Sequence, residues 1–334
     1  MTRLRSGVLM ALLALGIAVF AAGCGGNDDA GSDSNAKKDT VDVTQKRDLT
    51  IAMVTHGDGG SFWAVAKKGA EDGAKDMGVT LKYSESNNDP EEQAQLIEAA
   101  VTEKVDGLAV SVPNADAIKD ALAKATEAGI PVITLNSGAA DFADLGGSTH
   151  VGQTEAIAGE GAGQKLAAAG AKKMLCIIHE QSNVGLNERC DGAKKGFGSG
   201  EVENLQVAGT ADVSTTLTEI QSKLESDDSV DAVLALNPDI AVAARDAAQG
   251  ANSKAMVATF DLSGDVVKAI KAGEILFAVD QQQYLQGYLP VVFLTLNKTN
   301  ANTVGGGLPV LTGPGFVDKD NAETVEKLAA AGTR

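Results

Sequence analysis

The stretch "VDAVLALNPD" (Val230–Asp239) decides the fold, because the chain carries nearly the same pattern 125 positions earlier (230 − 105). The earlier stretch is "VDGLAVSVPN" (Val105–Asn114), and Pro113 and Pro238 coincide under that offset. Each stretch is a continuous apolar run, which is typical of a strand buried on both faces of a parallel sheet. The repeat therefore predicts two copies of one strand–helix–strand unit.

The same offset covers the strand that ends each unit. "VITLNS" (residues 132–137) matches "VATFDLS" (residues 257–263), and Asn136 falls on Asp261. In open parallel sheets, ligands bind beyond the carboxyl ends of the strands. If two such domains face each other, Asn136 and Asp261 point into one shared cleft. The alternative is that all α/β units share this composition, and the sequence leaves it open.

The rest of the chain keeps the same rhythm from Leu49 onward. Short β-rich runs such as "LTIAMVT", "VTLKYS" and "KKMLCIIH" alternate with Ala-rich helical patterns such as "SFWAVAKKGAEDGAKDMG". Strand, helix and strand repeated in this way predict an α/β fold with two similar doubly wound parallel-sheet domains.

The N-terminus has the pattern of an export signal. Arg3 and Arg5 precede an apolar run of 15 residues, from 8 to 22, which is shorter than the about 20 that a membrane span needs. We expect a signal peptide over residues 1–23. The ending "AAGC" resembles the lipobox of bacterial lipoproteins, although Ala21 stands where Leu is usual. This resemblance implies a lipid on Cys24, and an ordinary signal peptide is the alternative.

The segment after Cys24 is rich in Gly, Ser, Asn and Asp and has almost no large apolar residues. Such a composition cannot bury enough surface to offset chain entropy, so residues 24–47 are expected to form a lipidated flexible tether. The whole chain has 334 residues, 44% of them hydrophobic, and a net charge of −17. This acidity argues against nucleic acid and against anionic membrane faces as partners.

The sequence offers little for catalysis. The three histidines, His56, His150 and His179, have no partner at the spacing of a metal site. "GEGAG" (residues 159–163) resembles a phosphate loop, but it lies inside a helical stretch and not after a strand. We therefore expect no catalytic residue, no metal and no cofactor.

Cys176 and Cys190 are the two cysteines that follow Cys24. Export permits a disulfide between them. However, Cys176 is expected in a strand and Cys190 in the helix that packs on it, and such elements lie about 10 Å apart, beyond the about 7 Å that a disulfide can bridge. We expect two buried free thiols, with the disulfide as the alternative.

The sequence contains more residues suited to binding a polyhydroxy ligand than residues suited to catalysis. Asp, Asn, Gln and Arg supply planar donors and acceptors for hydroxyls, and an aromatic ring covers the apolar face of a sugar. Trp63 is the sole tryptophan and follows Phe62 at the start of the first helix. Adjacent helical positions cannot both face the core, so at least one is expected in the cleft. Four further polar candidates follow strands or open the next helix: Arg189, Asn237, Asp261 and Gln281.

At these residues the chain from about Asp48 to Leu311 resembles the ribose/galactose-type periplasmic sugar-binding proteins, the solute receptors of ABC importers. The stretches that carry the resemblance are "GGSFWAVAKKGAEDGAKDMGV", "NDPEEQAQLIEAAVTEKVDGLAVSV", "GIPVITLNS", "NERCDG", "VDAVLALNPD", "ATFD" and "VDQQQYLQGY". They are specific to the superfamily and less specific for the ligand.

The resemblance implies a ligand-binding role for eight positions. Phe62 and Trp63 match the aromatics that sandwich the sugar. The polar positions are Asn136, Ser137, Arg189, Asn237, Asp261 and Gln281. Three positions depart from the family. Asn136 is often Asp, Ser137 replaces an Arg of some members, and Val213 replaces a further aromatic. These departures argue against ribose as the ligand and favour another pentose, a polyol or a cyclitol.

The resemblance also implies a type I periplasmic binding fold joined by a three-segment hinge. We expect a first domain over residues 48–148 plus 282–308 and a second over residues 149–281 plus 309–334. The crossings are expected near Gly147–Thr149, Gln281–Gln283 and Gly307–Pro309. The Gly-rich "GGS" and "GGGLP" stretches support the first and third, because hinges must absorb changes in φ and ψ.

The expected protein is thus a monomeric binding lipoprotein that captures a sugar or polyol by hinge closure and delivers it to an ABC permease. It would be exported and anchored by its lipid on the outer side of the cytoplasmic membrane or in the periplasm. The alternatives are a sugar or autoinducer-2-type sensing receptor and, less favoured, an exported α/β carbohydrate-active enzyme.

Overall fold

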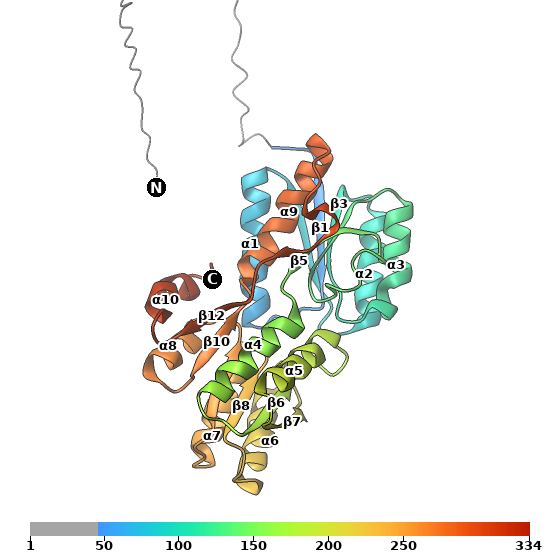
Figure 1. The fold of residues 1–334 in the computed structure, drawn as a ribbon. Coiled ribbons are helices and arrows are strands. Elements are labelled where there is room, and N and C mark those ends of the chain that lie inside the picture. Colours follow the sequence, from blue (N-terminus) through green and yellow to red (C-terminus); the bar gives the residue numbers. More distant parts are fainter. Residues whose placement is uncertain (1–45) are drawn as a thin grey trace, which may run out of the picture. The chain divides into compact units, whose positions relative to one another are not determined.

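The computed structural model describes residues 46–334 (Figure 1). The predicted signal peptide, Cys24 and nearly all of the predicted tether lie outside the described residues. Among residues 46–334, no helix combines the length and the apolar character that crossing a membrane requires.

The described chain forms two parallel-dominated α/β domains, as predicted. The first sheet has the strand order β11-β5-β4-β3-β1-β2 and the second β12-β10-β9-β8-β6-β7. The strands of the first sheet are β1 (Thr50–Thr55), β2 (Thr80–Glu85), β3 (Gly107–Ser111), β4 (Val132–Asn136), β5 (Gly147–Gly152) and β11 (Val310–Leu311). Those of the second are β6 (Lys173–Ile178), β7 (Glu201–Gln206), β8 (Ala232–Ala235), β9 (Met256–Phe260), β10 (Phe277–Asp280) and β12 (Gly315–Asp318).

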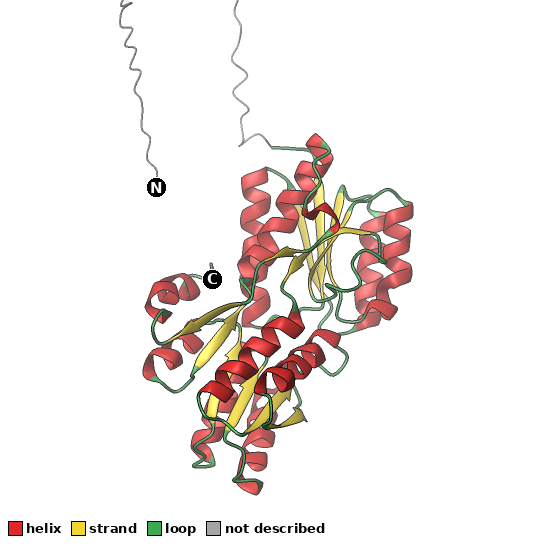
Figure 2. Ribbon diagram, viewed as in Figure 1, coloured by secondary structure: helices red, strands yellow, loops and turns green. Residues whose placement is uncertain are grey.

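Helices cover both faces of each sheet (Figure 2). The helices of the first domain are α1 (Ser61–Met77), α2 (Pro90–Thr102), α3 (Ala115–Glu127) and α9 (Gln283–Asn300). Those of the second are α4 (Glu155–Ala168), α5 (Val184–Phe197), α6 (Val213–Ser226), α7 (Pro238–Gly250), α8 (Gly264–Ala272) and α10 (Ala322–Ala330).

The sequence repeat corresponds to equivalent strands of the two sheets. The repeated stretches become β3 and β4 in the first domain and β8 and β9 in the second, and each pair occupies the same place in its strand order. The final strands differ, since β11 runs parallel to β5 whereas β12 runs antiparallel to β10. The two-copy interpretation is therefore confirmed for the central strands.

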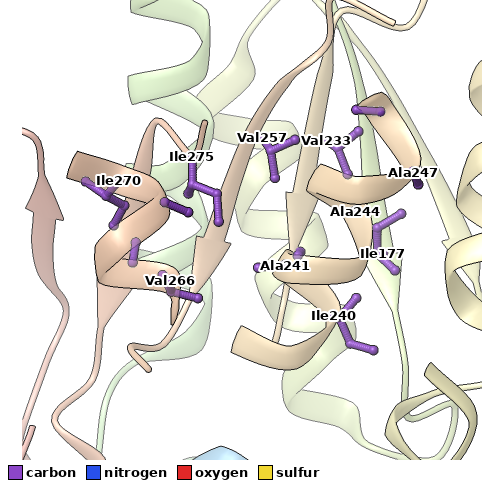
Figure 3. Close-up of a cluster of buried hydrophobic side chains, with 14 of the residues drawn as sticks. Ile177, Val233, Ile240, Ala241, Ala244, Ala247, Val257, Val266, Ile270 and Ile275 are labelled. Carbon is purple, nitrogen blue, oxygen red and sulfur yellow. The ribbon is translucent and has the colours of Figure 1, made fainter. Parts of the chain in front are cut away.

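The alternation of side chains along each strand divides the core. In β1, Ile51 and Met53 pack under α1 and α9, whereas Ala52 and Val54 pack under α2 and α3. In β6, Leu175 and Ile177 belong to the cluster beneath α6, α7 and α8, part of which is drawn in Figure 3. Both faces of the central strands are apolar because both are covered.

Glycines bring two helix pairs into close contact, α1 with α9 and α4 with α5. A Cβ on Gly69 would lie 2.1 Å from the carbonyl oxygen of Tyr284, and a Cβ on Gly159 would lie 2.1 Å from that of Arg189. These helices therefore approach backbone to backbone. Gly159 and Gly163 of the "GEGAG" stretch face α5, and Gly161 faces the Phe316 ring, so close packing accounts for these glycines.

Two of the three predicted crossings are corrected by the strands. All of β5 pairs with β4, so the chain leaves the first sheet after Gly152 and not near Thr149. Because β11 pairs with β5, the last crossing follows Leu311 and not the predicted Gly307–Pro309. The middle crossing lies between β10 and α9, at Gln281–Gln282, as predicted. The domain boundaries predicted at 148/149 and 308/309 shift by the same few residues.

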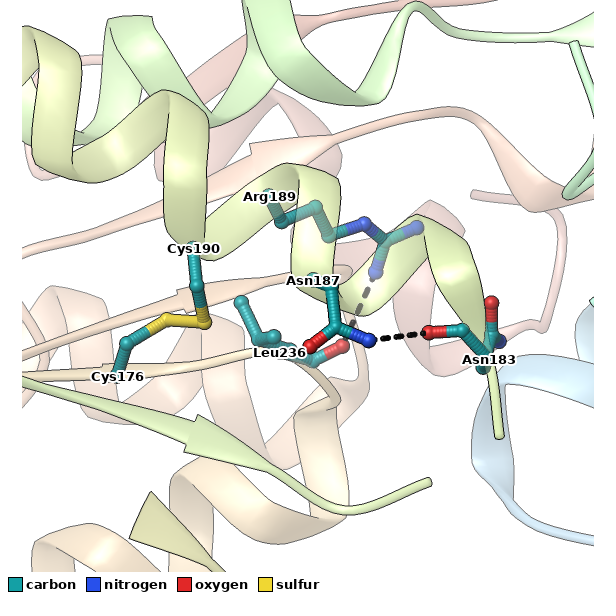
Figure 4. The surroundings of a disulfide bond; sticks show 6 residues. All are labelled: Cys176, Asn183, Asn187, Arg189, Cys190 and Leu236. Carbon is teal, nitrogen blue, oxygen red and sulfur yellow. Dashed lines mark hydrogen bonds between the residues drawn. A yellow bond between two sulfur atoms is a disulfide. The ribbon is translucent and has the colours of Figure 1, made fainter. Parts of the chain in front are cut away.

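The prediction of free thiols is wrong, because Cys176 and Cys190 form a disulfide (Figure 4). Their Cα atoms are 5.9 Å apart. The estimate of about 10 Å describes the distance between a sheet and a helix axis, and it does not apply to two residues that face each other across that space, as Cys176 and Cys190 do. Cys176 belongs to the face of the second sheet that packs against α4 and α5, together with Cys190.

Candidate ligand-binding site

A cavity of about 300 Å³, open solvent at its mouth included, lies at the carboxyl ends of strands from both domains. Its lining residues are His56, Phe62, Trp63, Asn136, His179, Glu180, Asn183, Leu186, Arg189, Leu236, Asn237, Asp261 and Gln281. Seven of the eight predicted ligand-binding residues are thus brought together, and Ser137 is the exception.

The two polar residues at the equivalent strand ends share an unusual backbone conformation. Asn136 has φ = 62° and Asp261 has φ = 70°. Left-handed φ is uncommon outside glycine, and Asn and Asp tolerate it best. At the same point of each repeat the chain thus turns out of its strand, and both side chains line the cavity.

Gln281 connects these two residues from the crossing between the domains. Its Nε2 donates to Asp261 Oδ1 at 2.8 Å, and its Oε1 accepts from Asn136 Nδ2 at 3.4 Å and from Gln286 Nε2 at 2.9 Å. A continuous polar chain therefore runs from the first domain through the middle crossing to the second. All of its members are buried.

Arg189 is held by a residue that sequence reasoning missed. Glu155, the first residue of α4, accepts from Arg189 Nε at 2.6 Å and from Nη2 at 2.9 Å. Arg189 Nη1 donates to the carbonyl oxygen of Leu236 at 3.2 Å (Figure 4), and the guanidinium lies 4.6 Å from the centre of the Phe260 ring. A bidentate pair fixes both position and plane. The two residues are 34 positions apart, which no local pattern reveals.

Within residues 46–334, Asp261 forms no ion pair comparable to that of Arg189 with Glu155. Burial raises the pKa of this carboxyl to about 7, although the charge of Arg189 and the Gln281 hydrogen bond oppose the rise. Because Glu155 takes two of the guanidinium's hydrogen bonds, Asp261 is left as a buried acceptor that ligand hydroxyls can satisfy.

The aromatic pair lines the cavity from the start of α1. The Phe62 and Trp63 rings meet edge to face with centroids 5.0 Å apart, and Trp63 meets the His56 ring in the same way at 4.8 Å. At least one of these two aromatic residues was expected in the cleft, and both line the cavity.

Asn237 and Ser137 make hydrogen bonds within the protein. Asn237 Oδ1 caps α7 by accepting hydrogen bonds from the backbone N–H of Asp239 and of Ile240. The side-chain nitrogen of Asn237 is therefore the atom that remains for a ligand in the cavity. Ser137 is buried behind the wall, where its hydroxyl lies within hydrogen-bond distance of Asn136 Oδ1 and Asn183 Oδ1. Val213, at the start of α6, is exposed and does not line the cavity.

Sequence reasoning also missed four polar lining residues: His56, His179, Glu180 and Asn183. His56 directly follows β1, and His179 and Glu180 directly follow β6. Their place after a strand was the available signal. Burial lowers the pKa of both His56 and His179 to about 3, so both rings are neutral at neutral pH.

The two domains also contact each other around the cavity. The backbone N–H of Ser61 donates to Asp239 Oδ2 at 3.1 Å, and that of Val184 donates to the carbonyl oxygen of Pro113 at 3.1 Å. The Thr210 hydroxyl also donates to Asp58. In this arrangement the cavity is enclosed by groups of both domains.

Comparison with known proteins agrees with this architecture. A family model described as a periplasmic binding protein domain matches residues 51–296. The chain belongs to the periplasmic binding protein family. This is a family of binding proteins rather than enzymes, and membership implies an extracytoplasmic location.

Among similar proteins, the ribose import binding protein of Haemophilus influenzae is 29% identical over 247 residues, covering 73% of this chain and 83% of its own. The fructose import binding protein of Bifidobacterium longum is 26% identical and covers 78% and 80%. A carbohydrate transporter from Acidothermus cellulolyticus 11B, solved in complex with myo-inositol, is 42% identical with a TM-score of 0.84 and covers 86% of this chain and 100% of its own.

Proposed function

We propose that this chain is the binding protein of an ABC importer and that its ligand is one cyclic polyol, with myo-inositol as the first candidate. The observation that carries the proposal is the lining of the cavity, which is polar on both domains and includes one aromatic pair. A neutral ring with many hydroxyls pairs with such walls without adding a net charge.

The relatives support this ligand class. The myo-inositol-bound protein shares 42% identity with this chain, more than the ribose and fructose import proteins do. The departures at Asn136 and Ser137 from ribose-type receptors point in the same direction. The predicted roles of Phe62, Trp63, Arg189, Asn237, Asp261 and Gln281 in binding are part of this proposal.

A thermal-shift screen against pentoses, hexoses, linear polyols and inositols tests the proposal. A ligand present at 100 times its dissociation constant stabilises by about 2.7 kcal/mol, which is a readily measured shift. We expect the largest shift with an inositol. If no member of the panel shifts the melting temperature, the proposal is refuted. Chromatography of the ligand after incubation separates a receptor from an enzyme, because a receptor returns its ligand unchanged.

We also propose that the protein is a lipoprotein anchored through Cys24 and that it delivers its ligand to a permease. The support for the anchor is the "AAGC" pattern at the end of an export signal. Lipid chains hold a protein to a membrane at about 0.8 kcal/mol per buried CH₂, and two or more chains hold it firmly.

Replacing Cys24 by serine is therefore expected to move the protein from the membrane to the soluble fraction of the cell envelope or the medium. Fractionation and immunoblotting measure this distribution. The matched control is Ser34→Ala, a substitution in the expected tether that leaves Cys24 and the disulfide in place. A Cys24→Ser protein that still sediments with membranes would contradict the assignment.

A further inference from the structure

The cavity has a second group of polar residues that the proposed contacts around Asp261 do not use. His56, His179 and Glu180 line the cavity, and each side chain is at least nine-tenths buried. Glu180 Oε2 lies 3.7 Å from His56 Nε2, and Glu180 Oε1 lies 3.7 Å from His179 Nε2. We call these three residues the distal pole.

The distal pole lies away from the Asp261 end of the site in both sheets. In the first sheet, β3 separates β1, which His56 follows, from β4, which Asn136 ends. In the second sheet, β8 separates β6, which His179 and Glu180 follow, from β9, which Asp261 follows. Neighbouring strands are about 4.8 Å apart, so the two ends of the site are about 10 Å apart.

The members of the distal pole are fixed in place. His56 Nδ1 lies 2.7 Å from Ser111 Oγ, which also accepts from the backbone N–H of His56 at 2.9 Å. Asn183 Nδ2 donates to Glu180 Oε2 at 2.7 Å. Burial raises the pKa of Glu180 to about 7, against the opposing effect of the Asn183 hydrogen bond. These supports hold the ring and the carboxyl at the cavity wall.

One polar atom at this pole has no partner. Within residues 46–334, His179 Nδ1 is buried and makes no hydrogen bond. Leaving such an atom unsatisfied costs about 1–3 kcal/mol, so buried polar atoms are rarely orphaned without a reason. A ligand hydroxyl in the cavity would satisfy it. The neutral imidazole can either accept from or donate to a hydroxyl, according to its tautomer.

We infer that His179 and Glu180, with His56, bind a hydroxyl on the side of the ligand ring opposite the one held by Asp261 and Gln281, and thereby select rings hydroxylated at both ends. This inference rests on the proposed function and names the selective feature of the site. A fully hydroxylated six-membered ring satisfies both ends, whereas a ring lacking the distal hydroxyl leaves His179 and Glu180 unpaired.

The test combines variants with matched ligands in titration calorimetry. The variants are His179→Phe, which keeps a ring but removes both nitrogens, and Glu180→Gln, which keeps the shape but removes the charge. The control is Glu127→Gln, an exposed carboxyl at the end of α3. The probes are myo-inositol and its monodeoxy analogues, one for each ring position.

We expect His179→Phe to weaken myo-inositol binding about tenfold to a hundredfold, as the loss of a hydrogen bond to a buried group does. One monodeoxy analogue should bind the wild type weakly and lose little further in the variant. The ligand-free variant should unfold at the same temperature as the wild type or higher, because an orphaned nitrogen has been removed. Glu180→Gln should lower affinity in the same ligand-dependent way, and Glu127→Gln should leave it unchanged.

Three results overturn the inference. In the first, the wild type binds myo-inositol, and both variants weaken the binding of all analogues by one common factor or leave it unchanged. The distal pole then does not bind a particular hydroxyl, and the proposed function stands. If the wild type binds none of these probes, the cyclitol assignment fails and the inference fails with it. A His179→Phe protein that unfolds well below the wild-type temperature would indicate a structural role instead.

Discussion

Replacing Glu155 by alanine is expected to destabilise the ligand-free protein by about 3–5 kcal/mol, because it leaves the Arg189 guanidinium buried without its counter-ion. Glu155 and Arg189 are 3% and 4% exposed, and their two hydrogen bonds of 2.6 and 2.9 Å join α4 to α5. Urea unfolding followed by the fluorescence of Trp63 measures the change in the free energy of unfolding.

The same two helices supply a matched control. Glu160 on α4 pairs with Lys195 on α5 at 2.7 Å, but the side chains of this pair are 31% and 73% exposed. Exposed pairs contribute about 0–1 kcal/mol, so Glu160→Ala should have little effect. If Glu155→Ala costs no more than Glu160→Ala, the buried pair does not hold Arg189 in the way described.

Replacing Asp261 by alanine is expected to weaken ligand binding by about 2–4 kcal/mol, or about thirtyfold to a thousandfold. The change removes a buried acceptor at the carboxyl end of β9 and leaves Gln281 Nε2 without its 2.8 Å hydrogen bond. Calorimetry with the ligand from the screen measures the loss. Asp265→Ala is the control, since that carboxylate lies on the surface of α8 and pairs with Lys268. Unchanged affinity in a folded Asp261→Ala protein would contradict the assignment.

The stability of the ligand-free protein should carry a pH signature of the same carboxyl. Because burial raises the pKa of Asp261 to about 7, its contribution to stability is fully present below its unfolded-state pKa and is lost as the pH rises through about 7. The wild type should therefore lose stability relative to Asp261→Asn as the pH rises from about 4 to about 7, and the difference should level off at higher pH. Glu180, whose pKa is also raised, is present in both proteins, so its contribution cancels in the difference between their stabilities. A pH-independent difference would contradict this.

The sequence predicted the fold well where a strong pattern repeats. The apolar strands around Val105 and Val230 are buried on both faces, so their composition alone identifies them as central parallel strands. The predicted positions of the chain crossings between the domains were less accurate. β5 contains "GSTHVG" and β11 has two residues, and neither has the apolar run that marks a strand.

Cavity-lining residues were predicted where they stand at strand ends and were missed where side chains meet only after folding. Asn136 and Asp261 were found because they occupy the same place in a repeat. His179 and Glu180 also follow a strand, but the contact of Glu180 with His56 from the other domain forms only on folding. The disulfide was missed because spacing does not reveal that Cys190 lies on the side of α5 that faces β6.

We propose, as the central claim, that a ligand is captured by closure of the two domains over one cavity. Contacts from both sides are required, because a ligand shifts a conformational equilibrium only through interactions that are better in one state. Trp63 and Asn136 come from the first domain and Arg189, Asn237 and Asp261 from the second, so the closed form is the one in which a ligand meets both. The hinge would lie at the three crossings that follow β5, β10 and β11.

Small-angle X-ray scattering with and without the ligand identified by the screen tests this claim most directly. The ligand-free protein is expected to populate an open form, and the radius of gyration should decrease on saturation, at ligand concentrations that match the calorimetric affinity. A radius of gyration that stays constant through saturation, with binding verified in the same sample, would contradict capture by hinge closure.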